Sequence, residues 1–189
     1  MLAQLEALRE RIEHGITRAE LLDCLPPGGA RNALDAALWD LEAKRRGLPA
    51  WKLAGVDPPR PLLTTFTIGA DEPARMAEHA RGFSGARALK LKLTEDDQNA
   101  ERVRAVRAAR PDVWIMVDAN QGFTRDSLSR LLPTLQQCRV SLIEQPFPIG
   151  KESWLDDLDR PIPIAADESV QDHTDLARLA GRVDTINIK

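Results

Sequence analysis

The sequence has few cysteines and histidines, and their spacing excludes several kinds of metal and redox protein. Its two cysteines, Cys24 and Cys138, lie far apart and belong to no CxxC or CxH pattern. A zinc-finger site and a thioredoxin-type redox motif both need such spacing, so we expect free thiols. The three histidines do not recur at metal-ligand spacing either, and we expect them on the surface.

Long apolar runs and a large net charge are also missing. No stretch reaches transmembrane length, and the first twenty residues carry a charge every few positions, unlike a signal peptide. The 26 basic and 29 acidic side chains leave a net charge of -3, which gives no field to hold a phosphate backbone. The four tryptophans are scattered and are not interleaved with basic residues. We therefore expect a cytoplasmic protein with neither a nucleic acid nor a membrane as partner.

A proline-rich stretch divides the chain into two regions. Residues 3–14 and 30–46 have apolar side chains at helical spacing. The segment 55–61, GVDPPRP, predicts a linker because its prolines cannot continue a helix. We expect a helical region over residues 1–59 and a second domain over residues 60–189.

The second region alternates short apolar runs with amphipathic helices. The runs cover residues 62–68, 88–93, 113–118, 140–144, 161–167 and 185–189. Strands separated by helices form parallel βαβ units. Between two of these runs, the charged segment 101–110 is expected to be the solvated face of a helix. The fold class predicted is therefore α/β, a partial (β/α)₈ barrel with strands 1 to 6.

From the second strand onward, each unit ends in an ionisable residue. These residues are Lys92, Asp118, Glu144, Asp167 and Lys189, at successive intervals of 26, 26, 23 and 22 residues. A full barrel of roughly 250 residues allots roughly 30 to each unit, and its active site gathers at the carboxyl ends of the strands. The spacing therefore predicts that five charged side chains meet at one rim.

Two lysines alternate along the second strand. The two-residue period of a strand places Lys90 and Lys92 on one face and the leucines of the run ALKLKL on the other. Such lysines can also protect an exposed edge strand from pairing with other chains. Because this strand is second in a parallel series, we expect it to be flanked on both sides, with its lysines directed into the barrel.

Three carboxylates follow at the ends of the next three strands, Asp118, Glu144 and Asp167. Two carboxylates about 4 Å apart repel by roughly 4 kcal/mol at an effective dielectric near 20, so three converging ones need a metal, a proton or ion pairs. Ligands that are all oxygen favour a hard ion, and few protein ligands favour Mg²⁺ over Ca²⁺. The alternative is that each acid caps its own loop or helix independently.

Several short segments together resemble the muconate-lactonizing subgroup of the enolase superfamily. They are KLK at 90–92, VDANQGF at 117–123, IEQPF at 143–147, ADES at 166–169 and INIK at 186–189. Upstream, residues 30–49 are similar to the helical part of the family's capping domain, and TTFTIG at 64–69 is similar to the first barrel strand of its L-Ala-D/L-Glu dipeptide epimerases. The resemblance covers nearly the whole chain.

This resemblance implies a role for each residue that matches the family's motifs. Mg²⁺ would be held by Asp118, Glu144 and Asp167, with Asn120 and Glu168 as supporting polar neighbours. Lys92 and Lys189 would be the acid and base on opposite faces of the substrate α-carbon, and the ammonium of Lys90 would assist Lys92. Lys90 and Thr67 would contact the substrate carboxylate, although a β-branched residue such as Thr67 is also an ordinary strand former.

The same resemblance implies that the family's N-terminal antiparallel sheet and last two barrel strands are absent from this sequence. Three functions stay open on this ground. The first is the core of a Mg²⁺-dependent dipeptide epimerase that acts on a small carboxylate, with little or no turnover expected of this chain by itself. The second is a related enzyme, such as a cycloisomerase or o-succinylbenzoate synthase. The third is a non-catalytic barrel remnant whose exposed strand edges favour a homo-oligomer.

Overall fold

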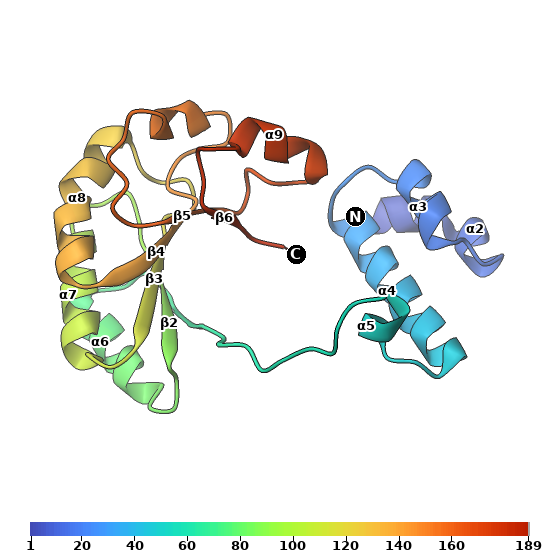
Figure 1. The fold of residues 1–189 in the computed structure, drawn as a ribbon, viewed down its shortest axis with the longest axis horizontal. Coiled ribbons are helices and arrows are strands. Elements are labelled where there is room, and N and C mark those ends of the chain that lie inside the picture. The colour runs from blue at the N-terminus through green and yellow to red at the C-terminus, as the bar shows by residue number, and fades with distance from the viewer. Residues whose placement is uncertain (189) are drawn as a thin grey trace. The chain divides into compact units, whose positions relative to one another are not determined.

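The computed structural model describes residues 1–188 and contains two compact units, one from Met1 to Pro61 and one that begins at Leu62 (Figure 1). Lys189, one of the two lysines expected to move protons, lies outside the described residues. Within residues 1–188, no helix is long and apolar enough to cross a membrane. The linker expected at residues 55–61 is exposed throughout.

The first unit is made of five helices, α1 (Leu2–Ala7), α2 (Arg9–Glu13), α3 (Arg18–Cys24), α4 (Gly29–Arg46) and α5 (Ala50–Leu53). The helix expected at 3–14 is two helices, because the backbone leaves helical geometry at Leu8. A capping box starts α3, in which Thr17 accepts from the backbone N–H of Glu20 and its own N–H donates to the Glu20 carboxylate. Buried apolar side chains of this unit form a small core.

The second unit is a sheet of six parallel strands in sequence order. Its strands are β1 (Phe66–Ile68), β2 (Ala88–Lys92), β3 (Trp114–Asp118), β4 (Val140–Glu144), β5 (Ile164–Ala166) and β6 (Thr185–Ile186). The helices are α6 (Pro73–Gly82), α7 (Asn99–Ala109), α8 (Arg125–Gln137), the 3₁₀ turns η1 (Glu152–Leu155) and η2 (His173–Asp175), and α9 (Leu176–Leu179). This order of elements confirms a partial (β/α)₈ barrel.

The side chains of the strands separate by face, as the two-residue period predicts. In β2, Leu89 and Leu91 are fully buried while Lys90 and Lys92 are only partly buried. Figure 1 shows α6, α7 and α8 along one side of β2, β3 and β4. The main core contains the apolar side chains of these helices together with those of the strands. The lysines therefore project from the other face, away from the helices that cover the sheet.

Two arginines in the charged segment 101–110 are buried, so the expectation of a wholly solvated face was wrong there. Arg102 and Arg110 are 5% and 8% exposed. Arg110 donates to the carbonyl oxygens of Phe83 and Ala86 at 2.6 Å each. A guanidinium carries five N–H donors, so it can satisfy buried carbonyls that a short side chain cannot reach. We expected these arginines on the surface because of their charge. The N–H donors of Arg110, directly after the end of α7, instead bind buried carbonyl oxygens.

The first strand is shorter than expected, and residues 62–64 ahead of it are exposed. Leu62 is 87% exposed and Ile188 is 91% exposed. The association of chains through such apolar surface stays a prediction.

Candidate active site

The strand register brings the lysines and the first two acids into neighbouring positions. Lys92 pairs with Asp118 across β2 and β3, and Asp118 pairs with Glu144 across β3 and β4. All three residues end their strands, so they lie at the carboxyl edge of the sheet. Two residues before Lys92, Lys90 pairs with Thr67 across β1 and β2. Thr67 is exposed, and its contact with a substrate stays a prediction.

Lys90 stands between two buried carboxylates. Its Nζ lies 2.8 Å from Asp118 Oδ2 and 2.5 Å from Glu144 Oε2. Lys92 approaches the same Asp118 oxygen at 2.6 Å. The acid side chains are each 1% exposed. Charges so far removed from water need partners of opposite sign, so the two ammonium groups balance the two acids.

The pKa values of these groups follow from burial and from one another. Burial acts to lower the pKa of Lys90, but its hydrogen bonds to Asp118 and Glu144 carry the pKa above its ordinary value. Burial acts to raise the pKa of Asp118, and the bonds from Lys90 and Lys92 reverse this and hold the pKa below its usual range. The pKa of Glu144 is raised, first by burial and then by the charges of Asp118 and Asp167, which Lys90 only partly offsets. Burial therefore decides the direction at Glu144, whereas the bonds from the two lysines decide it at Asp118.

A turn after β3 connects the site to a second strand end. The carbonyl oxygen of the Asn120 side chain accepts from Lys92 Nζ at 2.7 Å. Its amide donates to Glu168 Oε1 at 3.3 Å, and its backbone N–H donates to Asp118 Oδ1 at 2.9 Å. The φ angles of Asn120 and Gln121 are +43° and +69°, a strained conformation that clusters at functional sites. Asn120 thus links the lysine, the first acid and the loop after β5.

Asp167, the third acid expected at the rim, follows β5 and is 8% exposed. It is near enough to raise the pKa of Glu144. Even so, no three His, Cys, Asp or Glu side chains among residues 1–188 are placed together so as to hold a metal ion. The convergence of all three acids on one ion stays a prediction.

The residues present nevertheless fit a hard divalent cation. A cationic group, the Lys90 ammonium, already lies between Asp118 and Glu144. Glu144 Oε2 is buried, so a cation 2.5 Å away balances its charge in place of water. Donors that are all carboxylate oxygen suit Mg²⁺. Asp118, Glu144 and Asp167 are the residues that could hold such an ion.

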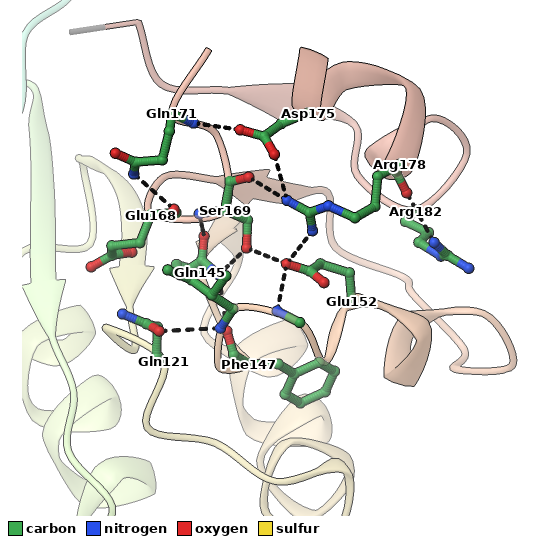
Figure 2. Close-up of polar contacts among 12 residues, drawn as sticks. Gln121, Gln145, Phe147, Glu152, Glu168, Ser169, Gln171, Asp175, Arg178 and Arg182 are labelled. Carbon is green, nitrogen blue, oxygen red and sulfur yellow. Dashed lines mark hydrogen bonds and ion pairs between the residues drawn. The ribbon is translucent and has the colours of Figure 1, made fainter. Parts of the chain in front are cut away.

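Several polar residues that contact the acids or the loops carrying them were not predicted from the sequence. Asn187 donates to Glu144 Oε1 at 2.5 Å. Gln145 accepts from the backbone N–H of Asp167 at 2.9 Å, and Ser169 donates to Glu152 at 2.7 Å (Figure 2). Gln145, Ser169 and Asn187 lie inside segments that carry the family resemblance, but spacing alone assigns them no partner.

Comparison with known proteins agrees with this geometry. The family described as "Enolase C-terminal domain-like" matches residues 73–189, and the "Mandelate racemase / muconate lactonizing enzyme, N-terminal domain" matches residues 3–55. An L-Ala-D/L-Glu epimerase of Escherichia coli K12 is 38% identical over 191 residues, which cover 100% of this chain and 59% of that protein.

Solved structures similar to this chain include an enolase family member and a dipeptide epimerase. An enolase family member from Agrobacterium tumefaciens with homology to dipeptide epimerases, containing sodium and L-Ala-L-Glu, has a TM-score of 0.91 and 44% identity, covering 98% of this chain and 57% of that one. A dipeptide epimerase from Methylococcus capsulatus, complexed with Mg and L-Arg-D-Lys, has a TM-score of 0.82 and 37% identity, covering 90% and 51%.

The chain thus spans between half and three fifths of the length of these relatives. One family match extends over more than half of the sequence, and the sheet carries acids and lysines at its strand ends. The chain belongs to the enolase superfamily, within its mandelate racemase/muconate lactonizing enzyme branch.

Proposed function

We propose that this chain supplies the ion-binding and proton-transfer groups of a Mg²⁺-dependent epimerase that inverts the carbon next to a carboxylate. One observation carries the proposal, the meeting of Lys90 and Lys92 with Asp118 and Glu144 at the ends of three adjacent parallel strands. The names of the relatives, which include epimerases of L-Ala-D/L-Glu and of other dipeptides, favour a dipeptide as substrate. The two free thiols favour a cytoplasmic location.

The reaction needs positive charge at the substrate carboxylate. Removal of the α-proton leaves its C–H electron pair on the carboxylate, which then carries a second negative charge. Mg²⁺ held by Asp118, Glu144 and Asp167 would supply positive charge at this place. The Lys90 ammonium, which the ion would displace from between Asp118 and Glu144, would add positive charge beside the same carboxylate. We propose that Lys90 and Thr67 contact the substrate carboxylate from neighbouring strands.

Lysines on two faces would make the exchange an inversion. Lys92 as a neutral amine takes the α-proton and becomes an ammonium, and the ammonium of Lys189 returns a proton to the opposite face. The reverse assignment inverts the other enantiomer. Asn120 holds Lys92 Nζ at 2.7 Å, which directs the amine toward the edge of the sheet where a substrate can arrive. Lys92 is 33% exposed, so a proton acceptor at this position is accessible to substrate.

The test is exchange of the substrate α-proton in D₂O. With L-Ala-L-Glu and Mg²⁺, proton NMR should show only slow loss of the glutamate α-proton signal, because little turnover is expected of this chain by itself. Lys92→Ala should abolish the exchange, whereas the matched control Lys44→Ala, a 74% exposed lysine in the helical unit, should leave it unchanged. Exchange at the same rate in Lys92→Ala, or without Mg²⁺, would refute the proposed roles.

A further inference from the structure

The side chain of Gln145 uses every hydrogen-bonding position of its amide. Oε1 accepts from the backbone N–H groups of Asp167 at 2.9 Å and Ser169 at 3.1 Å. Nε2 donates to the carbonyl oxygen of Phe147 at 2.9 Å and to Ser169 Oγ at 2.8 Å. Gln145 is 4% exposed. Since two donors and two acceptors are matched, the amide has one orientation and is locked in it.

The backbone of Gln145 also joins loops. Its N–H donates to the carbonyl of Ala165, and its carbonyl accepts from the N–H of Gln121, both at 2.8 Å. Its φ angle is +38°, which costs a non-glycine residue free energy and persists only where the surroundings hold it. The residue directly after Glu144 is therefore connected both to the turn after β3 and to the strand before Asp167.

A second set of contacts holds the loop after β5 at Ser169, where Glu152 and Arg178 lie beside it (Figure 2). Ser169 Oγ donates to Glu152 Oε1 at 2.7 Å, and the same carboxylate oxygen forms an ion pair with Arg178 at 2.5 Å. Arg178 also donates to the backbone carbonyl of Ser169 at 2.9 Å. The backbone N–H of Gly150 donates to Glu152 at 3.1 Å. The turn after β5 is thus held by a carboxylate and a guanidinium as well as by Gln145.

We infer that Gln145 is a positioning residue for the cation, one that sets the place of the Asp167 loop relative to Glu144 and thereby the affinity for a divalent ion. The inference rests on the proposed function and deepens it. Gln145 would touch neither ion nor substrate, since protein groups take all four positions of its amide. Its amide holds the backbone of Asp167, one proposed ligand. Its own backbone directly follows Glu144, another proposed ligand. Residues that hydrogen-bond to metal ligands orient those ligands. A loop that is already ordered before the ion binds lowers the entropic cost of binding.

The test is a calorimetric titration of the full chain with Mg²⁺ alone. Gln145→Leu keeps a side chain of similar size and removes all four hydrogen bonds. We expect about 10- to 100-fold weaker Mg²⁺ binding, the usual effect of losing a partner behind a ligand. Gln137→Leu, the same change at an exposed position of α8, is the matched control and should bind like the unmodified chain.

A second control distinguishes the proposed effect of Gln145 on Mg²⁺ affinity from a purely structural effect on stability. Val106→Ala opens a cavity in the main core on α7 and should lower the unfolding temperature without changing Mg²⁺ affinity. Unchanged affinity in a folded Gln145→Leu variant would overturn the inference. If Gln145→Leu does not fold, as near-ultraviolet circular dichroism of Trp154 beside Phe147 would report, Ser169→Ala decides instead. It removes one of the four bonds of Gln145 together with the bond from Ser169 to Glu152. Binding should weaken at least about fivefold, the effect of losing one neutral hydrogen bond, and wild-type affinity would overturn the inference.

Failure of the proposed function itself gives a different result. In that case the unmodified chain binds no Mg²⁺, or binds it equally well after Asp118→Asn.

Discussion

Replacing Glu152 with glutamine removes a buried negative charge and almost nothing else, so its effect on stability can be worked out from the structure. Burial acts to raise the pKa of Glu152, but bonds from Ser169, Arg178 and backbone N–H groups outweigh it and lower the pKa from 4.5 to about 2. The side chain is 7% exposed, so little of this is screened by solvent. At 1.36 kcal/mol per pKa unit, the charge contributes about 3 kcal/mol to the free energy of unfolding.

The pH dependence has a definite sign. A carboxylate whose pKa is lower in the folded state stabilises the fold above pH 4.5, its unfolded value, and this stability is lost as the pH falls toward 2. Urea unfolding at pH 7 should show Glu152→Gln less stable than the unmodified chain by about 3 kcal/mol, and by about 2 kcal/mol less than that at pH 3. The control is Glu101→Gln, at a 58% exposed side chain, which should change stability by less than about 0.5 kcal/mol at either pH. A Glu152→Gln difference that is equal at the two pH values would refute this reasoning.

Two other substitutions test the site and a helix start. Lys90→Met leaves Asp118 and Glu144 buried without the ammonium between them, so we expect a loss on the order of 3–5 kcal/mol in urea unfolding at pH 7. Added Mg²⁺ should restore part of it, and stability equal to that of the unmodified chain without Mg²⁺ would contradict the role of Lys90. Thr124→Ala removes the side-chain acceptor for the N–H of Ser127 at the start of α8, which should cost about 1 kcal/mol in the same measurement, while Thr124→Gly should cost only a few tenths. Equal losses for the two Thr124 variants would show that the cap is not the cause.

Three of the strands that pair on both sides were predicted well, whereas the run at 161–167 begins three residues before β5. The runs at 88–93, 113–118 and 140–144 agree within one residue at each end with β2, β3 and β4. Most residues of these three strands are buried, so their apolar pattern follows their pairing. The run at 62–68 forms a strand only from Phe66 to Ile68, where it pairs with Leu89, Lys90 and Leu91. An apolar run in the sequence shows which residues can form a buried strand. The neighbouring strand decides how many of them do.

The site was predicted in part for the same reason. Even spacing placed Lys92, Asp118 and Glu144 at neighbouring strand ends, and their register pairs agree with this. Spacing could not show that Lys90 bridges the two acids, because this depends on the direction of a flexible side chain. Gln145 was missed because its partners lie 22 and 24 residues away in an irregular loop, where no periodicity links them.

The central claim is that Asp118, Glu144 and Asp167 hold one divalent ion at the carboxyl ends of the strands. A crystal of the chain grown with Mn²⁺, which replaces Mg²⁺ at carboxylate sites, tests it most directly through anomalous diffraction. We expect one strong peak in contact with oxygens of all three side chains, with the Lys90 ammonium displaced from between Asp118 and Glu144. A peak that touches none of them, or Lys90 still bridging Asp118 and Glu144 with no ion beside it, would contradict the proposed ion site.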